Sequence, residues 1–315
     1  MTAAVLLISY NRPELVFRRL IELASMDVIP RNVILSIDGH KDLEDNEYRS
    51  EYSSKLASQE LPFEILVKFR DSNLGCSKHI ITAVTEVLED YEKVIVVEDD
   101  VVLCPFFLSS MLTAFNISAN IDNIATIGGF SNFHKRVHFP FFFRKNYWRS
   151  TRYFSAWGWG TTRKFWEGFI ELGQIDDLEG FLSSSQHWNK LSNRKRNIWL
   201  KRFGRGVWDY NVQLMLFKHD KFNLLPALRI IDNEGFSDFR STHTKHRRPK
   251  NLFGIGYSKV KPQKFKVTGY YFWLNFFWTF VDSNLWAADG LFNSRARNRG
   301  IRTFLRDLIK RVSSF

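Results

Sequence analysis

Three consecutive acidic residues, Glu98, Asp99 and Asp100, follow the apolar run Val94–Val97. Carboxylates this close together repel one another and resist burial, and a divalent cation removes that conflict. Hard oxygen ligands of this kind suit Mg²⁺ or Mn²⁺. Alternation along a strand would place Glu98 and Asp100 on one side and Asp99 on the other, so that one acid holds a metal while its neighbour hydrogen-bonds a ribose. A solvated acidic turn, or a helix N-terminus ahead of Pro105, explains the same triplet without chemistry.

Polar side chains also follow the other apolar runs, each at the point where a strand should end. Arg12 could reach a diphosphate or a base, and Asp38 could accept a hydrogen bond from a pyrimidine N–H. Arg70, Asn73 and Gly75 come after the third run. The motifs also have plainer explanations: Asn11 as a helix cap, Asp38 and Gly39 as a turn, and Asn73 with Gly75 as a loop. Carboxyl ends of parallel strands meet at one edge of a sheet, however, so we expect these residues to gather beside the acids.

Short apolar runs predict the strands that carry these residues. Near-continuous apolar character at this length is typical of parallel strands covered on both faces. The runs are Ala3–Ile8, Val33–Ile37, Phe63–Phe69, Val94–Val97 and Ile124–Ile127. Helical stretches lie between them: Pro13 stands near the start of one, Ser77 could cap a second, and Pro105 opens a third. The alternation predicts an α/β fold with a mostly parallel sheet and helices on both faces.

Composition narrows the class of protein further. The chain has 315 residues, 44% of them hydrophobic and 25% charged, which excludes a disordered chain and allows one large domain or two closely packed ones. Its net charge of +12 predicts an anionic partner, such as nucleic acid, a nucleotide-sugar or anionic lipid. The absence of Gly-x-Gly-x-x-Gly and Walker-type loops gives no indication of a dinucleotide site or a P-loop. Two cysteines and no charged-then-apolar leader favour a reducing, cytoplasmic location.

The order of these motifs resembles the GT-A fold glycosyltransferases, in particular the bacterial nucleotide-diphospho-sugar transferases of polysaccharide biosynthesis. The Glu-Asp-Asp triplet is also similar to that of the N-acetylglucosaminyltransferase I type. The resemblance covers about residues 3–244, and each motif is unspecific by itself. The matching segments are 9–13, 38–39, 73–76, 98–100, 154–161, 208–210 and 233–244. The resemblance implies a nucleotide-diphosphate sugar donor, preferably a UDP-sugar, and a hydroxyl acceptor on a surface glycan or a lipid-linked glycan.

The resemblance also implies a role for each matched residue. Asp100 would bind Mn²⁺ or Mg²⁺, with His243 as a further candidate ligand. Asp209 would be the general base, because the acceptor hydroxyl must lose its proton as it attacks the anomeric carbon. One base opposite the leaving group implies inversion of configuration. The residues implied to contact the donor are Arg12, Asp38, Arg70, Asn73, Gly75, Asp99, Trp157 and Gly158.

These role assignments leave alternatives open. Asp209 is also explained as a helix N-cap, which would fit a retaining enzyme, and His243 as an ordinary loop residue. Trp157 and Trp159 are also explained as packing between the two halves of the domain. A nucleotidyltransferase is disfavoured, since the segment Ser9–Pro13 is not a glycine-rich loop. The non-enzymatic alternative is a basic lipid-binding or nucleic-acid-binding protein on a degenerate transferase fold, although we expect no nucleic-acid partner.

The chain divides into three predicted regions. Residues 1–130 form the nucleotide-sugar-binding half, and residues 131–262 form the half with the acceptor site and the base. Residues 263–315 form an aromatic and basic C-terminal helical extension.

Two basic segments in these regions have two alternative explanations each. The basic stretch 184–205 holds Trp188 and Trp199, which suggests a helix on the acceptor side or simple core packing. Residues 291–315 have seven basic residues, one acid and an amphipathic pattern. Such a helix can lie on an anionic membrane surface, here through residues 270–315 at the inner face of the plasma membrane, or dock on the domain.

Overall fold

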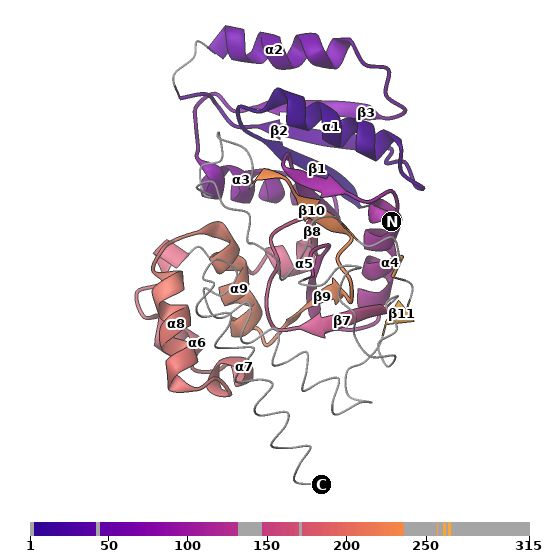
Figure 1. Cartoon of the computed structure of the whole chain (residues 1–315). Helices are drawn as coiled ribbons and strands as arrows, with labels where there is room; N and C mark the ends of the chain where they lie inside the picture. Colours follow the sequence, from indigo (N-terminus) through magenta and orange to yellow (C-terminus); the bar gives the residue numbers. More distant parts are fainter. Residues whose placement is uncertain are drawn as a thin grey trace.

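A central sheet dominates the computed structural model, which describes residues 3–41, 45–131, 147–169, 172–235, 257, 261–262 and 264–265. The described strands form a nine-stranded sheet in the order β11-β7-β9-β6-β8-β4-β1-β2-β3 (Figure 1). These strands are β1 Ala4–Ser9, β2 Asn32–Ile37, β3 Glu64–Phe69, β4 Lys93–Glu98, β6 Ile124–Gly128, β7 Tyr147–Thr151, β8 Trp159–Thr162, β9 Phe222–Pro226 and β11 Lys264–Phe265. A separate antiparallel pair is formed by β5 (Val101–Leu103) and β10 (Ile231–Asn233).

Most neighbouring strands of the sheet run parallel. The pairs β1/β2, β1/β4, β2/β3, β6/β9 and β7/β11 are parallel. Strand β8 lies between β4 and β6 and is antiparallel to both, and β7 is antiparallel to β9. The predicted fold class, an α/β domain with a mostly parallel sheet, is therefore confirmed.

Helices cover both faces of this sheet (Figure 1). They are α1 Pro13–Ala24, α2 Asp45–Ala57, α3 Cys76–Asp90, α4 Phe107–Ser118, α5 Arg163–Trp166, α6 Leu178–Leu182, α7 Gln186–Asn189, α8 Asn193–Phe203 and α9 Trp208–Lys218, with a 3₁₀ turn at Leu172–Gln174. The five predicted strands correspond to β1, β2, β3, β4 and β6, and α1 begins at Pro13 as predicted. The predicted cap at Ser77 is wrong, because α3 begins at Cys76 and Gly75 occupies the N-cap position with φ of 75°.

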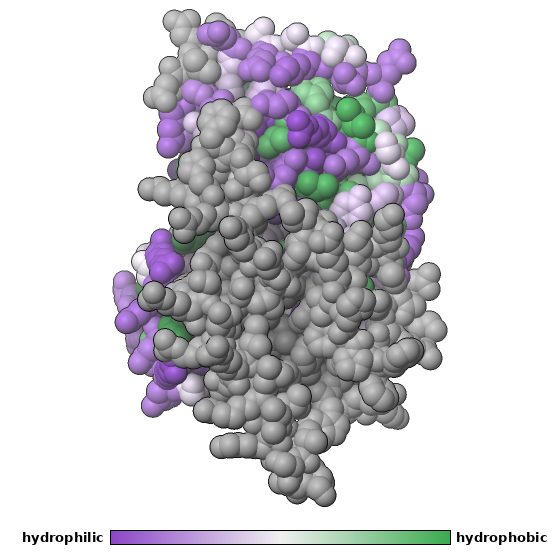
Figure 2. All heavy atoms as spheres, in the orientation of Figure 1, coloured by the Kyte–Doolittle hydropathy of each residue, from purple (hydrophilic) through white to green (hydrophobic). Residues whose placement is uncertain are grey.

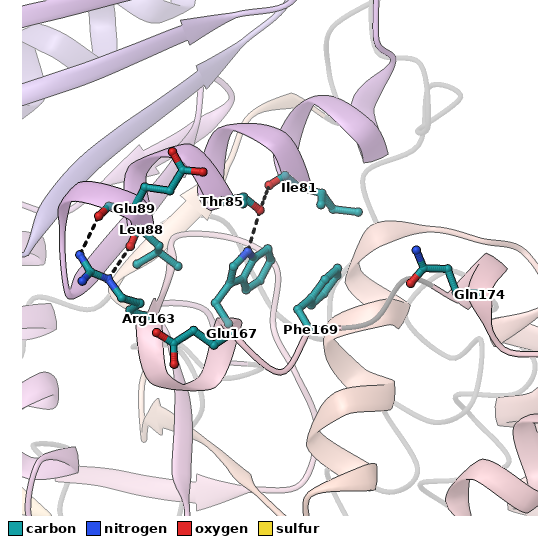
Figure 3. Close-up of a pocket in the computed structure, with 9 residues that line it drawn as sticks. Ile81, Thr85, Leu88, Glu89, Arg163, Glu167, Phe169 and Gln174 are labelled. Atoms are coloured by element: carbon teal, nitrogen blue, oxygen red, sulfur yellow. Dashed lines mark hydrogen bonds between the residues drawn. The ribbon is translucent and has the colours of Figure 1, made fainter.

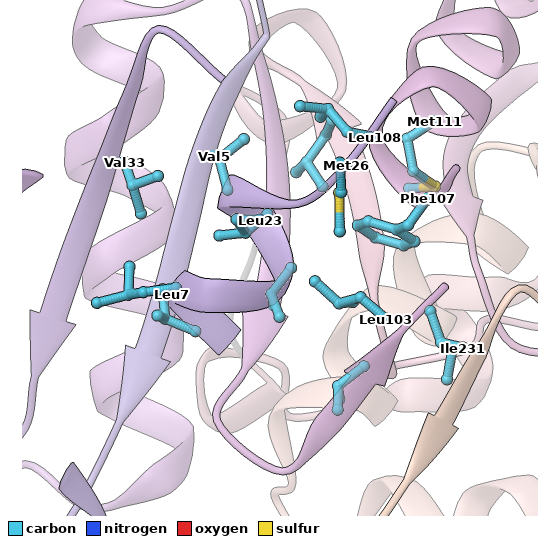
Figure 4. Close-up of a cluster of buried hydrophobic side chains, with 14 of the residues drawn as sticks. Val5, Leu7, Leu23, Met26, Val33, Leu103, Phe107, Leu108, Met111 and Ile231 are labelled. Atoms are coloured by element: carbon cyan, nitrogen blue, oxygen red, sulfur yellow. The ribbon is translucent and has the colours of Figure 1, made fainter. Parts of the chain in front are cut away.

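Alternating side chains of β1 divide the core into two layers. Val5 and Leu7 join α1, α2 and α4 in one buried cluster (Figure 4), whereas Leu6 and Ile8 join α3 and α9 on the opposite face. Each fully buried aliphatic side chain of this kind stabilises the fold by about 1.5–3 kcal/mol. Strands with both faces covered must be apolar throughout, which explains why β1 reads as a continuous apolar run.

A third buried cluster joins α6, α7, α8 and α9. Trp188 and Trp199 are 1% and 3% exposed and pack in it together with Phe203 and Phe217. Both tryptophans therefore have the core-packing role that was one of their two predicted explanations.

Several predicted features fall beyond the described residues. Apart from 264–265, the predicted extension 263–315 lies outside them, as do His243 and the basic segment 291–315. Within the described part of the chain, no helix combines the length and the apolar character that crossing a membrane requires.

Candidate functional site

The acidic triplet lies where β4 ends. Glu98 is the last residue of β4, Asp99 and Asp100 form a turn, and β5 begins at Val101. The Asp99 side chain is 1% exposed, and that of Asp100 is 16% exposed. Strand β1 runs parallel to β4 on one side and to β2 on the other, so the sheet brings Ser9, Asp38 and the triplet to one edge. The predicted gathering at the sheet edge thus has a structural basis in parallel pairing.

Arg12, one residue before α1, pairs with two members of the triplet. Its guanidinium forms a salt bridge with Asp99 through Nη2, and its Nη1 lies 3.4 Å from Asp100 Oδ2. The expectation that Asp99 and Asp100 point to opposite sides is therefore wrong. Alternation holds only within a strand, and β4 ends at Glu98, so the following turn lets one guanidinium reach both carboxylates.

Asp99 is held inside the protein by a hydrogen-bond network. Ser9 Oγ donates to Asp99 Oδ2 over 2.9 Å, and the Tyr52 hydroxyl lies 2.9 Å from Ser9 Oγ. The backbone N–H of Arg12 donates to the same Tyr52 hydroxyl over 3.3 Å. Burial raises the pKa of Asp99 to about 7, with the Arg12 charge opposing that rise. Asp99 therefore anchors Arg12 here, and its predicted contact with a ribose stays a prediction.

Asp100 is enclosed by the last residue of β10 and the turn that follows it. Asn233 Nδ2 donates to Asp100 Oδ1 over 3.3 Å, and the backbone N–H of Glu234 donates to the Asp100 carbonyl over 2.9 Å. Gly235 N donates to Asn233 Oδ1 over 2.8 Å, which closes the turn. Glu234 itself pairs with Arg19 over 3.0 Å. The sequence pattern assigns no separate role to Asn233 and Glu234, although both lie in a motif that carries the resemblance.

Gly235 leaves room for the Asp100 carboxylate. A Cβ atom at this position would lie 2.2 Å from Asp100 Oδ2, much closer than any non-bonded contact allows. Gly235→Ala should therefore displace the carboxylate and lower the free energy of unfolding by about 1–3 kcal/mol, the usual cost of overpacking. Denaturant unfolding measures this loss. Gly173→Ala is the control, because its new Cβ would meet no atom within 4 Å; equal stability of the two variants would contradict the close approach.

Electrostatic interactions connect the triplet with Asp209. Burial, and then the charges of Asp100 and Asp99, raise the pKa of Glu98 well above its ordinary value, and Asp209 raises it further. Burial also raises the pKa of Asp100, against the opposing effect of Arg12. These carboxylates therefore share one electrostatic environment with a surplus of negative charge.

Asp209 reaches this environment from the first turn of α9. The N-cap of α9 is Val207, so the alternative explanation of Asp209 as an N-cap is wrong. The backbone N–H of Trp208 donates to Ser77 Oγ over 3.3 Å, which joins the start of α9 to the start of α3. Trp208 also stacks on Trp159 with ring centroids 5.4 Å apart. A carboxylate in a first helical turn is stabilised by about 0.3–1 kcal/mol through the helix dipole, so Asp209 also supports α9.

Asp38 organises the loop before α3. Its side chain is 2% exposed, and Oδ1 accepts hydrogen bonds from the backbone N–H groups of Gly39 and Leu74 over 3.0 and 2.8 Å. Oδ2 accepts from Gly75 N over 3.0 Å and from Asn73 Nδ2 over 3.3 Å. Asn73 Nδ2 also donates to the Gly39 carbonyl over 2.6 Å. Asp38, Asn73 and Gly75 thus form one structural unit at the sheet edge, and their contact with a donor stays a prediction.

This arrangement predicts a stability role for Asp38 in the absence of any ligand. Asp38→Ala leaves one buried and two partly buried backbone N–H groups without this acceptor, and a buried group left unsatisfied costs about 1–3 kcal/mol, so we expect a loss of at least about 1 kcal/mol in the free energy of unfolding. Denaturant unfolding of the ligand-free protein measures this loss. Asp71→Ala is the matched control, since Asp71 lies on the same loop with a fully exposed side chain. A residue that only contacted a ligand would leave the unfolding free energy unchanged.

Arg70 lies on the α3 side of this edge. Its guanidinium forms a two-point salt bridge with Glu86 on α3, at 2.5 Å from Nη1 to Oε1 and 3.0 Å from Nη2 to Oε2. Nη2 also donates to Ser36 Oγ over 3.3 Å. The Arg70 guanidinium is thus bonded to Glu86 and Ser36, and the predicted contact of Arg70 with a donor stays a prediction.

Trp157 and Gly158 precede β8. The antiparallel pairing of β8 with β4 begins at Trp159, opposite Val96, so Trp157 and Gly158 lie just before the paired strands, on the side of the sheet where β4 ends. The Trp157 ring packs edge to face on Phe130 with a centroid distance of 4.8 Å. Gly158 has φ of 56°, which favours glycine, and its carbonyl accepts from Gly129 N over 2.7 Å. Trp157 therefore stands at the edge where the predicted donor sugar would bind.

The described residues do not include a complete set of metal ligands. Among the residues it describes, no group of three or more His, Cys, Asp and Glu side chains could hold a metal ion. The predicted ligand His243 lies beyond those residues. The donor chemistry of Asp100 and Glu98 nevertheless fits a hard divalent cation, because the Asp100 charge raises the pKa of Glu98 and a cation would relieve that repulsion.

A cavity of about 530 Å³ lies away from the acids, against the second half of α3 (Figure 3). Its lining includes Glu89 and Glu167. Trp166 Nε1 donates to Thr85 Oγ1 over 2.9 Å across it, and Arg163 donates to the Leu88 carbonyl. The triplet and Asp209 are not part of the lining, so this cavity is separate from the candidate site.

No protein-family model matches the sequence, and no protein of curated function matches it. Similar solved structures include the mannosyltransferase PcManGT from Pyrobaculum calidifontis in complex with GDP-Man and Mn²⁺, with 15% identity, a TM-score of 0.35, and coverage of 52% of this chain and 45% of that chain. TarS 1–349 from S. aureus in complex with UDP has 14% identity and a TM-score of 0.37, with coverage of 58% and 55%. HddC from Yersinia pseudotuberculosis has 13% identity and a TM-score of 0.32, with coverage of 53% and 79%.

The chain thus spans about half the length of the first two structures. Likeness of this extent does not decide an activity or a substrate, which depend on the geometry of the site.

Proposed function

We propose that this chain is a metal-dependent glycosyltransferase that takes a sugar from a nucleotide-diphosphate donor and transfers it to a glycan hydroxyl. The observation that carries the proposal is the gathering of Asp99, Asp100 and Glu98 at the carboxyl edge of a parallel sheet, within electrostatic reach of Asp209. Open α/β sheets bind ligands at this edge. The resemblance of the ordered motifs to GT-A transferases supports the same function.

The donor side of the proposed site consists of Arg12 and the triplet. Asp100, together with Glu98, would hold Mn²⁺ or Mg²⁺, which would stabilise the negative charge that develops on the leaving diphosphate. Arg12 now spans Asp99 and Asp100, so a bound cation would free part of its guanidinium to contact a phosphate oxygen. UDP is the preferred nucleotide through the resemblance.

The acceptor side depends on Asp209. A carboxylate oxygen of Asp209 accepts the proton of the acceptor hydroxyl as that oxygen attacks the anomeric carbon. The bond to the leaving diphosphate breaks as the new glycosidic bond forms. Because one base on the face opposite the leaving group supports direct displacement, the product has inverted configuration. The Trp157 ring would lie against the sugar, near the end of β4.

The same geometry argues against a module that binds nucleic acid through this edge. Four carboxylates in one electrostatic environment would repel a phosphate backbone unless a cation were present, whereas a single diphosphate can share that cation.

A nucleotide panel tests the proposed function. The thermal unfolding midpoint of the full chain is measured with UDP, GDP and CMP, each with and without Mn²⁺. A rise in the unfolding midpoint with one nucleotide-diphosphate that requires Mn²⁺ supports the proposal. An unchanged midpoint with every nucleotide-diphosphate would contradict it. Release of the sugar from the matching nucleotide-sugar then identifies the donor.

A further inference from the structure

Helix α8 carries an exposed basic ridge. Between residues 180 and 208 the chain has seven Lys and Arg residues and no Asp or Glu. Four of the seven are exposed: Lys190, Arg194, Lys201 and Arg205. We call these four residues the α8 basic surface. Arg194 and Lys201 are seven residues apart and so lie on the same side of the helix.

The opposite side of α8 packs against α9. Trp199 and Phe203 are 3% and 1% exposed, and both rings pack on Phe217 of α9. Arg202 stacks over the Trp199 ring at 5.0 Å. The apolar side of α8 is therefore buried in the protein, and its exposed side carries cations and the neutral residues Asn193 and Asn197 but no acid.

The four cations have no acidic partner among the residues that the structure describes. In the part of the chain that the structure describes, no salt bridge joins any of them to Asp or Glu. Figure 2 shows mainly hydrophilic atoms at its lower left, where α6, α7 and α8 lie in Figure 1. Like charges held on one side of a short helix repel one another, so a bound polyanion would relieve this repulsion.

The α8 basic surface also adjoins the proposed catalytic base. The Trp199 ring of α8 meets the Tyr210 ring of α9 edge to face, with centroids 6.3 Å apart. Tyr210 directly follows Asp209 in the first turns of α9. Arg205 of the α8 basic surface comes four residues before Asp209, so this surface ends next to the start of α9.

We infer that the α8 basic surface binds a polyanionic acceptor, a linear glycan that carries phosphate or carboxylate groups, and directs its hydroxyl to Asp209. The inference rests on the proposed function for its acceptor role, whereas polyanion binding itself does not. An anionic membrane is the weaker partner for α8, since an interfacial helix needs a free apolar side and this helix has buried its own.

Binding of inorganic polyphosphate, a linear polyanion, tests the inference on the full chain. Fluorescence anisotropy compares the parent protein with the triple variant Arg194→Gln/Lys201→Gln/Arg205→Gln at 0.1 M salt. The matched control is Arg31→Gln/Lys41→Gln/Lys164→Gln, which removes the same charge from exposed positions elsewhere. We expect about a 10-fold or greater loss of affinity in the α8 variant, a smaller slope with salt, and a change of less than about 2-fold in the control.

Three outcomes would overturn the inference. Equal losses in both variants would mean that net charge alone drives binding. No binding of polyphosphate by the parent protein would exclude a polyanion site. Binding to phosphatidylglycerol vesicles that the α8 variant loses, without polyphosphate binding, would assign the surface to a membrane. UDP stabilisation is measured in parallel: its absence in the parent protein contradicts the proposed transferase, while its presence in the α8 variant shows that a lost polyanion affinity is not a lost fold.

Discussion

Asp209→Asn should lower the rate of sugar transfer by about 10²–10⁴-fold, the range that general acid–base catalysis contributes. The amide keeps the size of the carboxylate but accepts a proton far less readily, so the acceptor hydroxyl loses its base. Donor binding should be unchanged, because the triplet and Arg12 remain in place. The measurement is transfer to acceptor, with nucleotide stabilisation as the parallel readout.

Glu167→Gln is the control for this variant, since Glu167 is an exposed acid directly after α5 and lines the cavity that is separate from the triplet. It should transfer at the parental rate. Normal turnover by Asp209→Asn would show that Asp209 is not the general base and that it only stabilises the start of α9. That result would favour a retaining mechanism on the same fold.

Asp100→Ala should abolish the Mn²⁺-dependent stabilisation by UDP. A ligand at 100 times its dissociation constant stabilises the folded state by about 2.7 kcal/mol, and we expect the whole of this gain to disappear. The carboxylate is the part of the turn that a cation and its diphosphate would share, whereas Asp99 is buried behind Arg12. Thermal unfolding with UDP, with Mn²⁺ and with both measures the effect.

Asp71→Ala provides the comparison, because its exposed carboxylate follows β3 at the sheet edge but does not contact the triplet. Its response to UDP and Mn²⁺ should equal that of the parent. Because Asn233 and Arg12 both contact Asp100, the ligand-free unfolding midpoint of Asp100→Ala is measured first. A full response to both ligands in this variant would contradict the assignment of Asp100 to the metal.

The sheet was predictable because its strands are covered on both faces and therefore apolar throughout. All six residues of β1 and the four central residues of β4 are buried, so both strands appear in the sequence as uninterrupted apolar runs. Helix α2 was not predicted, since it is largely polar: it contributes Tyr48 and Tyr52 to the buried core, and Leu56 packs against that core. β8 was also missed: its four residues, Trp-Gly-Thr-Thr, are too few to show a period.

The candidate site was predictable as a location but not as a set of contacts. The ends of parallel strands must meet, so the sequence order alone brings Asp38 near the triplet. The pairing of Arg12 with Asp99 depends on where β4 stops, and the enclosure of Asp38 depends on how the loop at 72–75 folds back. Contacts of this kind are set by tertiary structure and leave no periodic signal in the chain.

Strand β8 ties the two predicted halves of the domain together. It belongs to the segment 131–262, yet it pairs with β4 of the first half on one side and β6 on the other. Removing it would expose two strand edges at the centre of the sheet, so neither half can melt while the other stays folded. Heat or denaturant should therefore reveal a single cooperative transition, and stability lost at β8 is lost at the acidic triplet as well.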